Sequence, residues 1–204
     1  MKLCVVLAGG AGRRMGGRKP QRLYQAQTLG EHALARAAGF ASRVALSVRE
    51  RPQAEGLPPV DLVFDPPEIE GPLAGVVGGL RYGAEIGAKQ VLTIPCDAPH
   101  LPDDLFRRLE AALVATPEAL AASARDPHRD HPACTLWRTA ALESVLAYAE
   151  AGHRSLRGLL AELNACQVLW EDPAGRQFLN LNTIEDLTAS GGQTAAPERP
   201  STLT

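Results

Sequence analysis

The stretch KLCVVLAGGAGRRMGGRK, residues 2–19, joins a predicted strand to a glycine-rich loop. Its first part, Lys2–Leu7, is a short run of β-branched and apolar residues, which is typical of a buried strand. Five glycines follow between Gly9 and Gly17, with three arginines and a lysine among or just after them. Such a backbone can come close to a ligand, and its exposed N–H groups and cations suit an anion. At the carboxyl end of the first strand of an open α/β sheet, this loop predicts a nucleotide site.

The rest of the chain alternates between strand-like and helix-like segments. Short apolar runs predict strands over Arg43–Val48, Val60–Phe64, Gln90–Ile94, Ala133–Trp137 and Cys166–Trp170. Apolar residues at helical spacing predict helices over His32–Phe40, Leu73–Ile86, Leu105–Leu113, Leu142–Ala149 and Leu156–Leu163. The alternation predicts an α/β protein of three layers, with a mostly parallel, Rossmann-like sheet covered by helices on both faces.

The end of the chain differs in composition from the rest. Asn182 is followed three positions later by Glu185, which predicts the start of a last helix. From Ser190 onward the sequence is polar, with Gly, Pro, Ser and Thr, so residues 190–204 are expected to form a flexible tail. The 204 residues are 45% hydrophobic, which suffices for a core without disulfides or a structural metal. We expect a single domain over residues 1–189.

Charge and cysteine content restrict the classes of partner and compartment. The net charge of -2 argues against a nucleic-acid partner, although a few local cations suffice for one nucleotide. The N-terminal apolar run meets glycines too soon for a signal peptide, and no stretch approaches the roughly 18 apolar residues of a membrane span. The four cysteines form no C-x-x-C pair and do not have the spacing of a zinc site. We expect a reduced, cytoplasmic protein.

A second candidate site is the turn Pro95-Cys96-Asp97-Ala98-Pro99, which ends the predicted strand Gln90–Ile94. A carboxylate at the carboxyl end of such a strand points into the ligand crevice of the sheet. Mg²⁺ takes hard oxygen ligands, usually one or two carboxylates together with substrate phosphates. Asp97 is therefore a candidate magnesium ligand, and the alternative is an aspartate that only caps the turn.

A third candidate site combines Asp65 with the turn Gly71-Pro72-Leu73-Ala74-Gly75. A rigid Gly-Pro turn that enters a helix can bring the helix N-terminus to a ligand. A helix start without any ligand explains the same residues about as well.

The glycine-rich loop resembles the signature loop of molybdenum cofactor guanylyltransferases and related nucleotidyltransferases. The shared pattern is Leu-Ala-Gly-Gly, two residues, Arg-Arg-Met-Gly-Gly and then a lysine, whereas a Walker A loop is excluded by its spacing. The resemblance implies that Leu7, Ala8, Gly9 and Gly10 contact the guanine nucleotide and that Lys19 contacts its phosphates. Family members often place the lysine one residue later, after an aspartate, whereas here Lys19 directly follows Arg18.

Three further motifs follow in the family's order, so the resemblance extends from about Lys2 to Leu187. It implies that Asp97 binds magnesium and that Asp65 holds the nucleotide, with Ser47 at the place of a family asparagine. It also implies a molybdopterin site in the C-terminal half, made by four residues: Arg129, His131, Asn180 and Asn182. Two other groups stay open: Asp126, His128, Asp130 and His131 as a metal cluster, and Arg154 and Arg157 as phosphate ligands or a solvated helix end.

The reaction that the resemblance implies is transfer of GMP from GTP to molybdopterin, with release of pyrophosphate. Asp97 would hold Mg²⁺, while Lys19 and Arg14 would stabilise the charge that builds on pyrophosphate. The N-terminal half would bind the nucleotide, and transient contacts with molybdenum cofactor synthesis proteins and recipient molybdoenzymes are expected. The alternatives are a cytidylyltransferase acting on the same pterin, a sugar-phosphate nucleotidyltransferase, and a non-catalytic nucleotide-binding protein.

Overall fold

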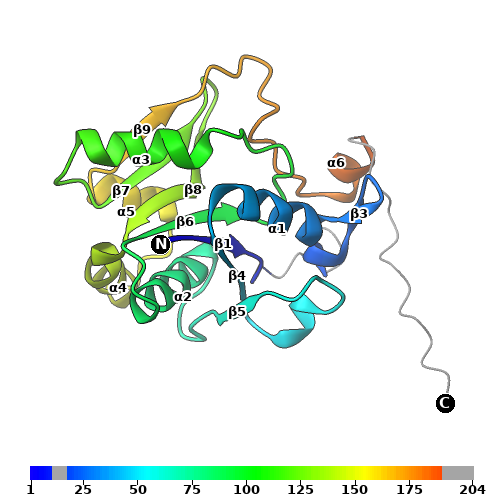
Figure 1. Cartoon of the computed structure of the whole chain (residues 1–204), viewed down its shortest axis with the longest axis horizontal. Coiled ribbons are helices and arrows are strands. Elements are labelled where there is room, and N and C mark those ends of the chain that lie inside the picture. The colour runs from blue at the N-terminus through cyan, green and yellow to red at the C-terminus, as the bar shows by residue number, and fades with distance from the viewer. Residues whose placement is uncertain (11–17, 190–204) are drawn as a thin grey trace.

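A seven-stranded sheet runs through the middle of the protein in the computed structural model, which describes residues 1–10 and 18–189 (Figure 1). In spatial order its strands are β5 (Asp61–Phe64), β4 (Arg43–Val48), β1 (Lys2–Leu7), β6 (Gln90–Pro95), β8 (Asp130–Arg138), β7 (Ala121–Arg125) and β9 (Cys166–Leu169). All neighbouring pairs are parallel except the two that β8 makes, with β6 and with β7. The predicted mostly parallel sheet is confirmed.

Helices cover both faces of this sheet. The described helices are α1 (Leu29–Phe40), α2 (Pro72–Glu85), α3 (Leu105–Ala115), α4 (Leu142–Glu150), α5 (Leu156–Glu162) and α6 (Ile184–Ala189). Alternate β1 side chains point to opposite faces, so Cys4 and Val6 pack with α1 and α3, while Leu3 and Val5 pack with α2, α4 and α5. Figure 1 shows α1 and α3 on one side of the sheet and α2 and α4 on the other. The predicted three-layer α/β fold is confirmed.

Local sequence signals explain where the elements differ from the sequence-based boundaries. The helix α1 starts three residues before the predicted His32, because Thr28 and Glu31 form a capping box. The last helix is capped by Thr183 and Asp186, one position after the predicted Asn182 and Glu185. Sequence reasoning did not predict β7, whose sequence AASAR has no β-branched or aromatic residue.

A small cluster outside the sheet brings the C-terminal segment to the carboxyl ends of the central strands. The hairpin of β2 (Leu23–Tyr24) and β3 (Gln27–Thr28) contributes Tyr24, which is buried with Leu29, Leu181 and Leu187. In Figure 1 the helix α6 lies beside this hairpin. The Leu181 N–H also donates to the Asp97 carbonyl at 2.9 Å. The cluster thus fixes the segment around Leu181 against the turn that follows β6.

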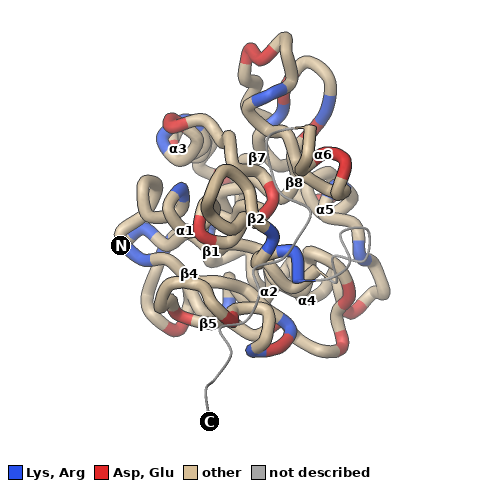
Figure 2. The backbone as a smooth tube through the Cα atoms, turned by 90° about the vertical axis from the view of Figure 1, so that its right-hand side faces the viewer, with Lys and Arg blue, Asp and Glu red and all other residues tan. Residues whose placement is uncertain are grey.

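The distribution of charged residues and the state of the cysteines are as expected from the small net charge and the absence of C-x-x-C pairs. Figure 2 shows basic and acidic positions interspersed over the described part of the chain. The four cysteines are free, and Cys4, Cys96 and Cys134 are buried. No helix among the described residues has the length and apolarity to cross a membrane. The predicted tail, residues 190–204, lies outside the described residues.

Gly39 is exposed in the last turn of α1, and a methyl group built there meets no described atom within 4 Å. Gly39→Ala should raise the free energy of unfolding by about 0.5–1 kcal/mol, because alanine loses less backbone entropy than glycine on folding. Urea unfolding followed by circular dichroism measures this, and Ala38→Gly on the same exposed face should lower the value by a similar amount. Destabilisation by Gly39→Ala would contradict the open space seen at this position.

Candidate active site

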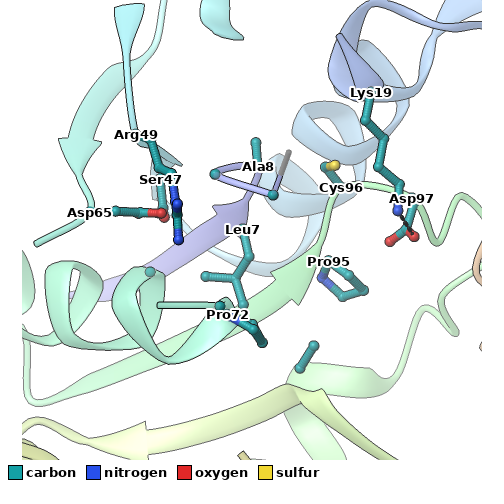
Figure 3. Close-up of a pocket in the computed structure, with 15 residues that line it drawn as sticks. Leu7, Ala8, Lys19, Ser47, Arg49, Asp65, Pro72, Pro95, Cys96 and Asp97 are labelled. Carbon is teal, nitrogen blue, oxygen red and sulfur yellow. Dashed lines mark hydrogen bonds and ion pairs between the residues drawn. The ribbon is translucent and has the colours of Figure 1, made fainter. Parts of the chain in front are cut away.

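A cavity of about 240 Å³ opens where β1, β4, β5 and β6 present their carboxyl ends. Its lining comes from segments that are far apart in sequence: Leu7, Ala8, Gly9, Gly10, Lys19, Ser47, Arg49, Asp65, Gly71, Pro72, Gly75, Pro95, Cys96, Asp97 and Ala133. Every described residue for which the sequence predicted nucleotide contact is in this set. Figure 3 shows Lys19 and Asp97 at one end, Ser47 and Asp65 at the other, and Leu7 and Ala8 between them. We call this cavity the strand-end pocket.

The first polar end of the strand-end pocket is built on Asp97. Its side chain is 6% exposed and forms an ion pair with the Lys19 ammonium group. Lys19 begins a short 3-10 helix, Lys19–Gln21, and its Nζ also lies 3.4 Å from Asn182 Oδ1. The fold therefore brings together two predicted catalytic residues and one predicted molybdopterin residue. Arg14, the other predicted catalytic residue, lies outside the described residues.

The second polar end is built on Ser47 and Asp65. Ser47 lies near the carboxyl end of β4 and is fully buried, and its hydroxyl donates to Asp65 Oδ1. The Asp65 backbone N–H donates to the Val48 carbonyl at 2.8 Å, which fixes the turn after β5. Burial raises the pKa of Asp65, although the bond from Ser47 and the charge of Arg49 act in the opposite direction. This end therefore holds a carboxylate that a ligand donor would stabilise.

Two glycines let the backbone come close to these polar groups. A Cβ on Gly9 would lie 1.9 Å from Asp65 Oδ2, and a Cβ on Gly75 would lie 2.5 Å from Ser47 Oγ. Only glycine fits at either place without moving the partner. Gly9 of the predicted glycine-rich loop thus packs against Asp65, the carboxylate predicted to hold the nucleotide.

The Gly-Pro turn behaves as the sequence predicted. Gly71 has φ 73°, a left-handed conformation that favours glycine, and Pro72 is the first residue of α2. Both residues line the strand-end pocket. The N-terminus of this 14-residue helix therefore begins at the pocket wall.

Cys96 lines the pocket beside Asp97 but is not a nucleophile. Burial and the adjacent Asp97 carboxylate raise the pKa of its thiol to about 12, even though Lys19 acts in the opposite direction. The thiol stays protonated at neutral pH, whereas a nucleophilic cysteine needs its thiolate.

A second cavity, of about 410 Å³, adjoins the first and shares Pro72, Pro95 and Ala133 with it. Of the four residues predicted to bind molybdopterin, Arg129, His131 and Asn180 line this second cavity. The fourth, Asn182, lines neither cavity, but its Oδ1 contacts Lys19 Nζ at the first polar end of the strand-end pocket. Arg154 and Arg157 also line the second cavity; Arg154 Nη1 donates to the Ala149 carbonyl at 2.9 Å. Their role as phosphate ligands stays a prediction.

Asp126 organises the loop that carries Arg129 and His131. Its Oδ2 lies 2.8 Å from His131 Nε2, and its Oδ1 accepts the backbone N–H groups of His128 and Arg129. Burial raises the pKa of Asp126, but these bonds outweigh it and lower the pKa overall. Within residues 1–10 and 18–189, no three His, Cys, Asp or Glu side chains form a metal-binding group. The Asp126 carboxylate is therefore used in holding the loop.

Burial sets the charge of His131. It lowers the pKa of the imidazole, and the Asp126 carboxylate acts against this without reversing it. The ring also stacks on Phe178, with centroids 4.4 Å apart. A largely neutral, fixed imidazole thus faces the second cavity.

Comparison with known proteins shows the family to which the chain belongs. A family model for the MobA-like NTP transferase domain matches residues 4–167. The chain belongs to this family. A molybdenum cofactor guanylyltransferase of Cereibacter sphaeroides is 37% identical over 191 residues, which cover 90% of this chain and 92% of the relative. The family resemblance inferred from the sequence is confirmed.

Solved structures show the same fold. Molybdopterin-guanine dinucleotide biosynthesis protein A from Archaeoglobus fulgidus superposes with a TM-score of 0.77 at 22% identity, covering 94% of this chain and 97% of that one. Rv0371C of Mycobacterium tuberculosis, solved in complex with manganese, has a TM-score of 0.62 at 16% identity and covers 93% of this chain and 97% of that one. These structures support the nucleotidyltransferase fold of the family member described here.

A substitution of Asp65 tests whether its buried charge lowers the stability of the ligand-free protein. Asp65→Asn should stabilise the ligand-free fold, because burial disfavours the charged carboxylate and an amide oxygen can still accept from Ser47. Since the pKa of Asp65 is raised on folding, its charge opposes folding above the ordinary carboxyl pKa, and this penalty is relieved as pH falls through the folded pKa. The difference in melting temperature between variant and wild type should therefore shrink between pH 7 and pH 4. A difference that grows on acidification would contradict this reading.

Proposed function

We propose that the protein transfers GMP from GTP to molybdopterin, releasing pyrophosphate and forming the guanine dinucleotide form of the molybdenum cofactor. The observation that carries this proposal is the pair of adjoining cavities, one with the polar ends described for the strand-end pocket and one lined by Arg129, His131 and Asn180. Two substrates bound side by side would meet at the shared wall of Pro72, Pro95 and Ala133. The name of the Cereibacter sphaeroides relative supports the same reaction.

GTP would occupy the strand-end pocket with its phosphates toward Lys19. Backbone groups of Leu7, Ala8, Gly9 and Gly10 lie at the carboxyl end of β1, where an α/β sheet binds nucleotides. Asp65 would accept a hydrogen bond from the nucleoside, since its Oδ1 is already paired with Ser47 while its carboxylate remains buried and polar. The pocket thus separates a nucleoside end from a phosphate end.

Asp97 fits a divalent metal ion, which we propose to be Mg²⁺. Its carboxylate is buried, follows the carboxyl end of β6, and places hard oxygen atoms beside Lys19, the lysine that would bind the phosphates. Magnesium sites of this kind use one or two carboxylates with substrate phosphates and water, so one protein carboxylate suffices. The manganese complex of the structural neighbour Rv0371C supports use of a divalent metal. When bound, the ion would neutralise phosphate charge and orient the α-phosphate.

The chain's own residues would act mainly by positioning and by charge. Lys19, oriented by Asp97 and Asn182, would donate to the phosphates and stabilise the charge that develops on the leaving pyrophosphate. Arg14 would add to this charge stabilisation. The terminal phosphate of molybdopterin would attack the α-phosphorus in line, so that one P–O bond forms as the bond to pyrophosphate breaks. The protonated Cys96 thiol is not required as a nucleophile.

Molybdopterin would bind in the second cavity. The guanidinium group of Arg129 and the amide of Asn180 offer donors for a pterin edge or a phosphate. The neutral His131 ring donates its Nε2–H to Asp126, so it offers a ligand only the Nδ1 acceptor. Asn182 would lie between the two substrates, because it contacts Lys19 and belongs to the same segment as Asn180. Cofactor synthesis proteins and recipient molybdoenzymes would exchange substrate and product at this side.

Calorimetric titration of the protein with GTP, CTP and ATP, each with Mg²⁺, tests the nucleotide. The proposal expects GTP to bind at least about tenfold more tightly than the other two, since a good base contact contributes roughly 1–3 kcal/mol. Tighter binding of CTP would favour the cytidylyltransferase alternative, and binding of none would refute the nucleotide site as described.

A further inference from the structure

Arg49 is a basic side chain at the nucleoside end of the strand-end pocket, and sequence reasoning did not identify it. It follows β4 directly and lines the pocket beside Asp65 and Ser47 (Figure 3). Its backbone N–H donates at 2.7 Å to Gln53 Oε1, which also belongs to the capping box that Glu50 and Gln53 form at the start of the 3-10 helix η3 (Arg51–Ala54). The backbone of Arg49 is thus held in place while its side chain faces the pocket.

At the nucleoside end of the pocket, Asp65 supplies hydrogen-bond acceptors and Arg49 supplies donors. The Ser47 hydroxyl hydrogen is used on Asp65 Oδ1, and Asp65 itself offers only acceptors when ionised. The Arg49 guanidinium has five N–H donors in a planar fork. Within residues 1–10 and 18–189 it forms no hydrogen bond or ion pair, although its charge lowers the pKa of Asp65. Arg49 is therefore a charged side-chain donor available to a ligand at this end.

Arg49 is also separated from the phosphate end of the pocket. Lys19 and Asp97 meet at one end, while Arg49, Ser47 and Asp65 lie at the other (Figure 3). On the proposed function, on which this inference rests, the phosphates take the Lys19 end. The base is then the part of the nucleotide that reaches Arg49.

We infer that Arg49 is a specificity-determining residue that reads the N7 and O6 edge of guanine. These two adjacent acceptors match an arginine fork with two parallel hydrogen bonds. Adenine places its N6 amino donor beside N7, and cytosine presents its N4 amino donor, so either base sets a donor against the guanidinium group. The two hydrogen bonds favour guanine, and the contact between two donors disfavours adenine and cytosine.

Titration calorimetry with GTP, 7-deaza-GTP and ATP, each with Mg²⁺, tests the inference on the full chain and on Arg49→Met. Methionine keeps a long side chain and removes the donors. Wild type should bind 7-deaza-GTP about tenfold more weakly than GTP, because N7 is lost as an acceptor. Arg49→Met should bind GTP about 10- to 100-fold more weakly than wild type and should no longer distinguish GTP from 7-deaza-GTP.

Arg51→Met is the matched control, because Arg51 lies two residues further on, packs over Phe64 and does not line the strand-end pocket. It should bind all three nucleotides as wild type does. An equal loss of GTP and ATP affinity in Arg49→Met, with the 7-deaza penalty unchanged, would place Arg49 on the phosphates and overturn the inference. Unchanged GTP binding in Arg49→Met, or no 7-deaza penalty in wild type, would also overturn it. Failure of the wild type to bind GTP would instead refute the proposed function, and the inference with it.

Discussion

Asp97→Asn should lower the rate of nucleotidyl transfer by roughly 10²–10³-fold while leaving the fold intact. The amide keeps the shape of the side chain but loses the charge that pairs with Lys19 and that would bind a divalent metal. Because Lys19 is 17% exposed, water can partly replace its lost partner, so the effect on stability should be much smaller than the effect on rate. Turnover assays over a range of Mg²⁺ concentrations, together with thermal melts, measure both.

Asp103→Asn is the control for this substitution, since the Asp103 side chain is 94% exposed and pairs with Arg36 at the surface. It should leave the rate within about twofold of wild type, as surface ion pairs contribute little. A near-normal rate in Asp97→Asn, with an unchanged Mg²⁺ dependence, would rule out the role assigned to Asp97.

Gly9→Ala should weaken GTP binding by about 10- to 100-fold and lower the free energy of unfolding by about 1–3 kcal/mol. The added methyl carbon would lie 1.9 Å from Asp65 Oδ2, so the carboxylate must move, which disturbs its hydrogen bond from Ser47. Both quantities can be measured, by titration with GTP and by urea unfolding. Gly39→Ala, where the methyl group meets no described atom, is the control for alanine itself.

A double-mutant cycle with Asp65→Ala isolates the cause of the Gly9 effect. Without the carboxylate the methyl group at position 9 has room, so Gly9→Ala should cost far less stability in the Asp65→Ala background than in wild type. Equal costs in the two backgrounds would show that the strain comes from the loop backbone instead.

Sequence periodicity predicted most of the fold because its central strands are hydrophobic on both faces. After Lys2 the strand β1 is apolar throughout, and its partners β4 and β6 are mostly apolar and buried, as a doubly covered parallel sheet requires. The strand β7 could not be predicted in this way. Four of its five residues are small, and the strand pairs with β8 on one side and β9 on the other, so the tertiary pairing determines its conformation and local propensity does not.

The parts of the candidate site that directly follow recognisable strands could be predicted from the sequence. Asp97 and the Leu7–Gly10 turn follow recognisable strands, so their convergence follows from parallel topology. Arg49 gave no such signal, because one arginine after a strand is ordinary, and only the folded pocket shows that its side chain faces Asp65. The sequence predicts Asn182 on the pterin side, whereas the contact between its Oδ1 and Lys19 depends on how the C-terminal segment packs on Tyr24 and Leu29. That packing has no short-range signature in the sequence.

Transfer of label from α-³²P-GTP to molybdopterin tests the central claim most directly. Purified protein, Mg²⁺ and molybdopterin should yield a labelled pterin dinucleotide together with an equal amount of pyrophosphate, and α-³²P-CTP should yield at most a tenth as much, in line with the expected base discrimination. Omitting molybdopterin should abolish pyrophosphate release, because the second cavity would then lack the attacking phosphate. Label transferred preferentially from CTP, or no transfer by a protein that binds both substrates, would contradict the account.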